Sequence, residues 1–425
     1  MIFQLDQLLF SLSMGLDAVE HEVLGTTTNH GKRIAILVSK MGKHLGLERS
    51  QLIGLFSSGL LHDNAVSEHR LSIQSGKEQM LNMRLHSIRG EENAMFLPFP
   101  ESIEGYIKYH HEFVDRSGPF GLDANTIPLG AQLIAIADDL DMRFDLSLEE
   151  TRLLENVTTY IKNKRGVYYT KIAADAMLEI MTEELIRGLR NDSVDAVFHD
   201  TIPQWIVNKP AVEIMKIAEI IGRITDYKST FTAKHSTQIA NRAYLMAHYY
   251  DLDEDTCAKI YIAAAFHDIG KLMIPIEILE KPGKLTDEEF EIIKSHVHWS
   301  YIMLKDIAGL EEICKWAVTH HRKLNGTGYP DLPAIYLVND FVCRLMTCID
   351  IYQAVREPRP YHTGRTHEET MVIMNGMVEK GEIDKKMTND LDTVMACITD
   401  GDGNVPDPFT EEYRELLQRI LARKD

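Results

Sequence analysis

A set of histidines and aspartates occurs twice along the chain, and no other feature limits the possible folds as strongly. Each copy contains one His, then His-Asp, a further His, a His-His pair and an Asp. The first copy consists of His30, His62, Asp63, His86, His110, His111 and Asp138. The second consists of His235, His267, Asp268, His296, His320, His321 and Asp350, at offsets of 205 to 212 residues. Such self-similarity indicates a tandem duplication of one domain, joined near 201–209.

The segments around these residues have the apolar periodicity of amphipathic helices. Apolar residues recur at i, i+3, i+4 and i+7 in 211–224, 235–249 and 286–307. Thr286 followed by Glu289 is a capping-box signal that opens the third of these helices. The apolar start of the chain lacks the basic region of a signal peptide and predicts another amphipathic helix. Strand signals are few and short. The predicted fold class is therefore all-α, with tandem helical bundles spanning 1–200 and 206–425.

The composition excludes several classes of function. The chain has 64 acidic and 45 basic residues, a net charge of −19, so we do not expect it to bind DNA, RNA or an anionic membrane. The sequence has no apolar run of the roughly 20 residues that a transmembrane helix needs. Irregular spacing of the cysteines predicts reduced thiols in the core of a cytoplasmic protein. These cysteines are Cys257, Cys314, Cys343, Cys348 and Cys397.

The repeated residue types point to metal chemistry. Imidazole and carboxylate groups are the usual ligands of divalent transition metals, and a His-rich set accepts Fe, Mn, Zn or Ni. One His on an apolar helix is more often structural than a ligand, but an ordered set that occurs twice favours chemistry. Five imidazoles and two carboxylates exceed the need of one ion and fit two ions about 3.5–4 Å apart, bridged by an aspartate and a water. Such a pair makes hydroxide available near neutral pH, so the predicted reaction is phosphoester hydrolysis.

Two motifs in the second half resemble a known family. HDIGK at 267–271 and HHRKLNGTGYP at 320–330 are similar to the motifs of the HD-GYP subgroup of the HD superfamily of metal-dependent phosphohydrolases. The resemblance covers about 206–400 in detail and roughly 20–190 in degenerate form. It implies hydrolysis of a cyclic dinucleotide, either cyclic di-GMP or 3′,3′-cyclic GMP-AMP (cGAMP). A metal-bridging hydroxide would open a 3′–5′ phosphodiester to give a linear dinucleotide.

The resemblance also implies a role for individual residues of the second domain. Asp268 would bridge two metal ions, and Lys271 would hold the scissile phosphate or help the leaving oxygen depart; these two are the expected catalytic residues. The implied metal ligands are His235, His267, Asp268, His296, His320, His321 and Asp350. The expected substrate-binding residues are Lys271, Lys323, Gly326, Gly328, Tyr329, Pro330 and Arg356.

The sequence departs from the family pattern in both halves. Arg322 and Asn325 replace the usual Glu and Asp, which removes two negative charges beside the site. Phe231 stands where members with three metals have a Glu, so two metals are expected. In the first domain Val66 replaces the lysine, and RSGPFG at 116–121 lacks the Tyr-Pro of the GYP loop. We therefore expect a vestigial metal site without turnover there, with the ion either bound or absent, in a structural or regulatory domain.

Three hypotheses follow. The first is a cytoplasmic cyclic dinucleotide phosphodiesterase. The second is another HD-type phosphohydrolase that acts on nucleoside mono- or triphosphates, against which the GYP loop argues. The third is a non-catalytic receptor that binds the dinucleotide and signals to a protein partner, which Arg322 and Asn325 leave open. A homodimer is compatible with each hypothesis, and the sequence does not choose between cyclic di-GMP and cGAMP.

Overall fold

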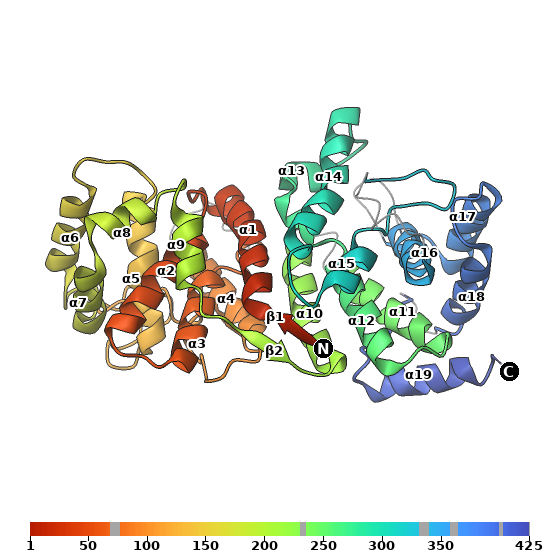
Figure 1. Cartoon of the computed structure of the whole chain (residues 1–425), viewed down its shortest axis with the longest axis horizontal. Coiled ribbons are helices and arrows are strands. Elements are labelled where there is room, and N and C mark those ends of the chain that lie inside the picture. Colours follow the sequence, from red (N-terminus) through yellow and green to blue (C-terminus); the bar gives the residue numbers. More distant parts are fainter. Residues whose placement is uncertain (69–76, 230–234, 331–339, 358–363, 399–402, 425) are drawn as a thin grey trace. The chain divides into compact units, whose positions relative to one another are not determined.

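The computed structural model describes residues 1–68, 77–229, 235–330, 340–357, 364–398 and 403–424 (Figure 1). Phe231 lies outside the described residues. The chain forms two compact units, Gln4–Ile206 and Met1–Phe3 with Val207–Asp425, which we call the N-terminal and C-terminal units. The predicted all-α class is confirmed, because helices are the regular elements of the described chain apart from two short paired strands, β1 (Ile2–Gln4) and β2 (Ile206–Asn208).

The N-terminal unit is built around one buried helix, α2, which packs against α3, α5, α7 and α9. The expected helix at the start of the chain is α1. The helices are α1 (Leu5–Leu24), α2 (His30–His44), α3 (Arg49–Leu60), α4 (Lys77–Ala94), α5 (Leu129–Phe144), α6 (Leu153–Lys164), α7 (Lys171–Ile180), α8 (Glu183–Gly188) and α9 (Val194–Thr201).

The C-terminal unit has α11 at its centre, packed against α10, α12 and α16. Its helices are α10 (Ala211–Asp226), α11 (His235–Tyr249), α12 (Glu254–Phe266), the 3-10 helix η1 (Ile269–Met273), α13 (Ile276–Leu279), α14 (Asp287–Leu304), α15 (Glu311–Ala317), α16 (Phe341–Arg356), α17 (His367–Glu379), α18 (Lys385–Met395) and α19 (Glu411–Leu421). The three helices expected from apolar periodicity are confirmed as α10, α11 and α14. The capping box is also confirmed, since Thr286 Oγ1 accepts the Glu289 N–H at 3.2 Å and the Glu289 carboxylate accepts the Thr286 N–H at 2.7 Å.

The repeated residues occupy corresponding places in the two units. His30 and His235 are the first residues of α2 and α11, and the His-Asp pairs follow the C-terminal ends of α3 and α12. Further along, α4 and α14 each contain one repeated His, and α5 and α16 each contain one repeated Asp. All five cysteines are buried free thiols, as expected. Among the described helices none is both long and apolar enough to cross a membrane.

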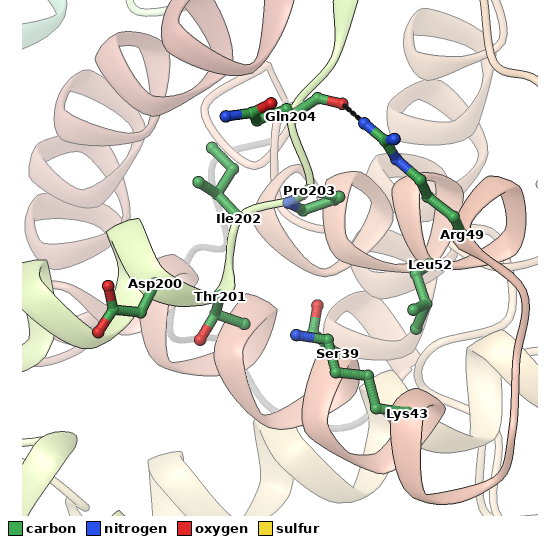
Figure 2. A pocket seen from close by; sticks show the side chains of 9 residues that line it. All are labelled: Ser39, Lys43, Arg49, Leu52, Asp200, Thr201, Ile202, Pro203 and Gln204. Carbon is green, nitrogen blue, oxygen red and sulfur yellow. Dashed lines mark hydrogen bonds between the residues drawn. The ribbon is translucent and has the colours of Figure 1, made fainter.

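A cavity of about 300 Å³ opens in the N-terminal unit, away from the repeated residues (Figure 2). It is lined by Ser39, Lys43, Arg49, Leu52, Asp200, Thr201, Ile202, Pro203 and Gln204. Arg49 closes one side by donating to the backbone carbonyl of Gln204 at 2.9 Å. None of these residues belongs to the repeated set, so the candidate site is not in this cavity.

Candidate metal centres

In the C-terminal unit, Asp268 stands between three imidazoles. Its Oδ2 lies 3.3 Å from His235 Nε2 and 3.1 Å from His267 Nε2. Its Oδ1 lies 3.2 Å from His296 Nε2. The two oxygens of one carboxylate therefore face different histidines, which is the arrangement that a bridging ligand requires.

The remaining repeated residues of this unit complete the cluster. His296, His320 and His321 offer ligand atoms within 4.8 Å of one another. Asp350 Oδ1 lies 3.9 Å from His267 Nε2, and Asp350 Oδ2 lies 3.4 Å from His321 Nδ1. The structure thus brings together all seven side chains that the repeat singled out.

Hydrogen bonds to the backbone orient these imidazoles. The Nδ1 atoms lie 2.6–2.7 Å from carbonyl oxygens one turn earlier, in the pairs His267–Ala264, His296–Ile293 and His320–Ala317. An N–H at Nδ1 leaves the Nε2 lone pair facing the cluster. The inward atoms without a hydrogen-bond partner in the described chain include Nε2 of His235, His267, His296 and His320 and Oδ1 of Asp268. Buried polar atoms normally have hydrogen-bond partners. These unpartnered nitrogen and oxygen atoms are suited to act as ligands of metal cations.

The electrostatics favour the metal-binding protonation states of Asp268, His320 and His321. Burial alone would raise the pKa of Asp268, but His267 and Lys271 hold it well below its usual range. Lys271 Nζ forms an ion pair with Asp268 Oδ2. Burial and neighbouring imidazoles hold the pKa values of His320 and His321 well below their usual range. Both rings are therefore neutral at pH 7, as metal ligation requires.

Glu357 is a supporting residue that the spacing analysis missed. Its Oε2 lies 2.7 Å from Nδ1 of His235. Burial lowers the pKa of His235, but Glu357 and Asp268 outweigh burial and raise it to about 9. Gln353 donates a hydrogen bond to Glu357 and accepts one from Arg242. A chain of hydrogen bonds therefore supports the carboxylate that contacts His235. The signal available in the sequence was the i+7 spacing from Asp350, two helical turns along one face.

We expect Glu357→Ala to weaken binding of divalent metal by about 10- to 100-fold, because carboxylate partners orient ligating imidazoles and raise their basicity. Competition with a coloured chelator measures the affinity. Glu382→Ala is the control, since Glu382 pairs with Lys323 and not with an imidazole of the cluster. Equal affinities for wild type and Glu357→Ala would contradict this role.

The predicted GYP loop lies beside the cluster. The ring centroid of Tyr329 is 4.7 Å from that of His321 and 6.4 Å from that of His296. Gly326 and Gly328 have φ angles of 82° and 95°, a region that favours glycine. A Cβ on Gly328 would also overlap the backbone carbonyl oxygen of His321. The second glycine therefore allows the loop to approach the histidine pair.

The two departures from the family motif both form bonds within this loop. Arg322 Nη1 donates to the carbonyl oxygen of Pro330 at 3.0 Å. Asn325 Oδ1 accepts from the backbone N–H of Thr327 at 3.1 Å and from its hydroxyl at 2.6 Å. The two residues that replace the usual acidic residues therefore stabilise the loop by hydrogen bonds within it.

The other two basic residues expected to bind substrate have protein partners. Lys323 Nζ pairs with Glu382 Oε2 at 2.7 Å. Arg356 donates to the backbone carbonyl of Arg365 at 3.3 Å. Lys271, by contrast, forms its ion pair inside the cluster itself, which makes it the stronger candidate for contact with a reacting phosphate.

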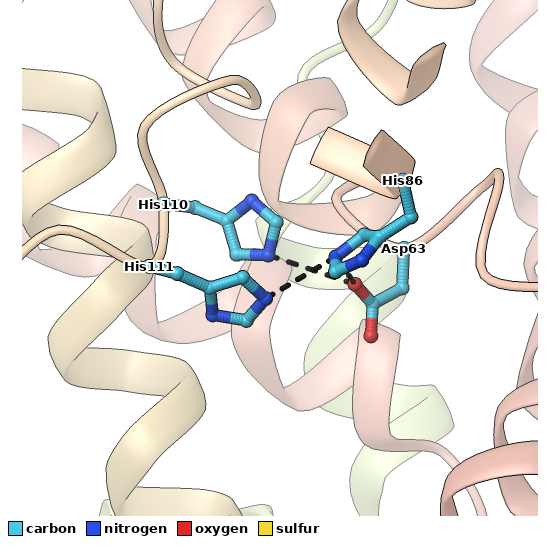
Figure 3. A group of neighbouring side chains, drawn as sticks. All are labelled: Asp63, His86, His110 and His111. Atoms are coloured by element: carbon cyan, nitrogen blue, oxygen red, sulfur yellow. Dashed lines mark hydrogen bonds and ion pairs between the residues drawn. The ribbon is translucent and has the colours of Figure 1, made fainter. Parts of the chain in front are cut away.

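The repeated residues of the N-terminal unit converge in the same way. Asp63 Oδ1 lies 3.3 Å from His86 Nε2 and 3.6 Å from His110 Nε2, whereas Oδ2 lies 3.7 Å from His62 Nε2. His111 Nε2 lies 3.2 Å from His86 Nε2. Figure 3 shows Asp63 and His86 pointing toward His110 and His111, which are neighbours on one segment. Asp63 thus has the same position between imidazoles as its counterpart in the C-terminal unit.

Carboxylates also support the first imidazole of the N-terminal centre. His30 Nε2 lies 3.3 Å from Asp138 Oδ1, and His30 Nδ1 lies 2.6 Å from Asp141 Oδ2. Asp141 also accepts from Arg33 at 2.7 Å. Glu20 is fully buried, neither of its oxygens has a hydrogen-bond partner in the described chain, and burial raises its pKa well above the usual range. The spacing analysis could not find Glu20, since its counterpart at the repeat offset is a threonine.

Comparisons with known proteins agree with this geometry. A family model described as HD domain matches residues 20–168 and 219–387, which confirms the resemblance to the HD superfamily. The 3′3′-cGAMP-specific phosphodiesterases 1 and 3 of Vibrio cholerae are 28% and 24% identical to the chain, over 90% and 88% of it and 90% of each relative. A cyclic di-GMP phosphodiesterase response regulator of Xanthomonas campestris is 29% identical over 36% of this chain and 41% of its own length. The crystal structure of a cyclic GMP-AMP-specific phosphodiesterase of V. cholerae shares the fold, with a TM-score of 0.62 and 22% identity over 92% of this chain and 97% of that chain.

Proposed function

The chain belongs to the HD domain family, and on that premise we propose that its C-terminal unit hydrolyses a 3′–5′ phosphodiester of a cyclic dinucleotide to give a linear dinucleotide. The observation that supports this most is the cluster of inward Nε2 atoms around Asp268, with the Lys271 ammonium on the same carboxylate. In this proposal the catalytic domain spans 206–425, and 1–200 is a related domain without turnover.

The donor set would hold two divalent transition metal ions, drawn from Fe, Mn, Zn or Ni. His235 and His267 would serve one ion, and Asp268 would be shared between both. The other ion would have the imidazoles of His296, His320 and His321, with Asp350 facing both groups. When bound, such ions acidify water and neutralise charge on phosphate oxygens.

The protein side chains would position the phosphodiester and move a proton. Lys271 is 18% exposed, so its ammonium can reach a phosphate oxygen and donate a proton to the departing 3′ oxygen. Burial and the nearby Asp350 raise the pKa of Tyr329, which keeps its phenol protonated as a hydrogen-bond donor. Gly326, Gly328 and Pro330 would shape the wall beside the nucleotide. Lys323 and Arg356 would contact phosphate after exchanging their present partners.

The preferred substrate in this proposal is cGAMP. The two relatives that match nearly the whole chain are named as cGAMP-specific. Five relatives named for cyclic di-GMP match only 32–39% of the chain, and a third cGAMP-specific relative matches 38% of it. Whole-length similarity includes more of the residues that determine substrate choice than a match to the catalytic core does.

A product assay on the full chain tests the proposal. The protein is loaded with Mn²⁺ or Fe²⁺ and offered cyclic di-GMP, cGAMP and a panel of nucleoside mono- and triphosphates in separate reactions. We expect a linear dinucleotide from cGAMP at the highest kcat/KM, and no product after chelation of the metal. Binding without product would favour a receptor, and cleavage of nucleoside phosphates alone would favour a different HD-type phosphohydrolase. Either result would overturn the proposal.

A further inference from the structure

The N-terminal unit retains the ligands of a metal centre but has no counterpart of the catalytic lysine. Nε2 of His30, His62 and His110 and Oδ1 of Asp63 are buried without a hydrogen-bond partner in the described chain. Val66 occupies the place of Lys271 and is 1% exposed. A centre of this kind can bind an anion, yet the residue proposed to protonate the leaving oxygen is missing.

A group of basic and aromatic side chains is carried by the segments that also carry the ligands of this centre. The Phe120 ring has the Arg84 guanidinium 4.9 Å and the Lys108 ammonium 5.9 Å from its centroid. The Tyr109 ring meets it edge-on, with centroids 5.1 Å apart. Arg84 is exposed, and the other three are partly exposed. We call Arg84, Lys108, Tyr109 and Phe120 the basic–aromatic rim.

The rim is attached directly to the metal-ligand segments. Arg84 precedes His86 by two residues on α4, and Lys108 and Tyr109 come immediately before His110. The loop that carries Phe120 also approaches the ligand segment, because a Cβ on Gly118 would overlap the backbone carbonyl oxygen of His111. The backbone therefore joins the rim to the segment that carries His110 and His111. A ligand held at the cluster would therefore meet cationic and aromatic groups together.

A cation and an aromatic ring also lie together in the C-terminal unit, where the ring of Tyr329 contacts the imidazole of His321. Lys294 precedes His296 by two residues, as Arg84 precedes His86. The Lys294 ammonium lies 5.9 Å from the ring centroid of Tyr329. Both units therefore combine a cation, an aromatic ring and an imidazole cluster, although the loop sequences differ. Aromatic rings stack on bases, and Arg binds phosphate oxygens through its forked donors.

A buried carboxylate holds Phe120 in place. Glu112 is 2% exposed, and its two oxygens accept the backbone N–H groups of Phe120 and Leu122, each at 2.7 Å. A Cβ on Gly118 would overlap this carboxylate, so the glycine allows the close approach. The loop that lacks the Tyr-Pro sequence is thus a defined structure that fixes an aromatic side chain.

We propose that the N-terminal unit binds a dinucleotide phosphate at its metal centre without cleaving it. Phe120 would stack on a base, and Arg84 and Lys108 would contact phosphate oxygens beside the centre of Asp63 and its histidines. The ligand class rests on the proposed function, and the cyclic substrate and the linear product share the required phosphate and base chemistry.

The test counts bound nucleotides on the full chain. Lys271→Met, which is expected to bind nucleotide but cleave it slowly, is loaded with Mn²⁺ and examined by equilibrium dialysis with cGAMP and, separately, with the linear dinucleotide. We expect two nucleotides per chain for the ligand that the N-terminal unit recognises. Adding Arg84→Ala and Phe120→Ala should weaken one of the two sites by about tenfold or more. Adding Lys294→Ala and Tyr329→Ala instead should weaken the other.

The outcomes separate this proposal from the proposed function. One bound nucleotide that is lost with Lys294→Ala and Tyr329→Ala, and unaffected by the rim substitutions, would overturn the proposal and leave the catalytic assignment intact. Linear product formed by an Asp268→Asn chain and lost on adding Asp63→Asn would also overturn it, because the N-terminal unit would then cleave. Absence of product from the wild-type chain would contradict only the proposed function. Arg84→Glu alone, at an exposed position, repeats the test should the double rim variant fail to fold.

Discussion

Asp268→Asn is expected to lower the rate of linear dinucleotide formation by about 10³-fold or more. Both oxygens of Asp268 face imidazoles, 3.1–3.3 Å away, so an amide would replace one acceptor by a donor and remove the shared charge. Metal-dependent stabilisation of a phosphoryl transition state amounts to several kcal/mol, and each 1.36 kcal/mol changes the rate tenfold. Initial rates by chromatography and metal content by atomic absorption measure the two effects.

Asp63→Asn is the matched control for this variant. Asp63 has the same place in the N-terminal centre, with imidazoles at 3.3–3.7 Å, so the two substitutions cause a similar local disturbance. We expect a much smaller loss of turnover from Asp63→Asn, with a comparable loss of bound metal. Wild-type rates in a folded Asp268→Asn protein would contradict the assignment of catalysis to the C-terminal unit. Thermal unfolding of both variants shows whether the fold is retained.

The repeat predicted which side chains converge because an ordered set of residue types persists at a nearly constant offset. The helices followed from apolar periodicity, and two ligand helices begin at the repeated histidines His30 and His235. A metal centre built from helix ends and helix faces needs few residues in a fixed order, so the sequence order alone shows which residues belong together. The fold class and the residues of both clusters could therefore be predicted from the sequence alone.

The residues behind the imidazoles were not accessible in that way. Asp141 lies three residues after Asp138, whereas Glu357 lies seven residues after Asp350. Each of these carboxylates is nevertheless the hydrogen-bond partner of the first imidazole of its unit. Residues three and seven positions after an aspartate both lie on the same face of its helix, so a carboxylate at either position can reach the imidazole. Arg322 and Glu112 form hydrogen bonds with backbone groups of their loops. Every residue type except proline offers the same backbone groups, so the sequence does not show where such bonds form. A search for a constant offset misses contacts of both kinds.

Lys271→Met is expected to lower kcat by about 10²- to 10⁴-fold, the usual contribution of a positioned general acid. Methionine keeps the length of the alkyl stem and removes the ammonium that pairs with Asp268. None of the ligand imidazoles changes, so we expect the metal content to remain that of the wild type. Stopped or continuous assays of linear dinucleotide formation measure kcat, and dialysis measures the affinity for the uncleaved nucleotide. Lys271→Arg keeps the charge and should retain more activity than Lys271→Met.

This substitution also makes the C-terminal unit resemble the N-terminal unit, where Val66 stands at the corresponding position. If the lysine supplies the proton to the leaving oxygen, Lys271→Met should leave a centre that binds metal and nucleotide but releases little product. That is the state we assign to the N-terminal unit, so one variant tests the chemical explanation for the difference between the two copies. A Lys271→Met protein with wild-type kcat would show that the lysine does not act on the leaving group. The absence of turnover expected for the N-terminal unit would then need another cause, and the altered loop around Phe120 would be the first region to exchange between the units.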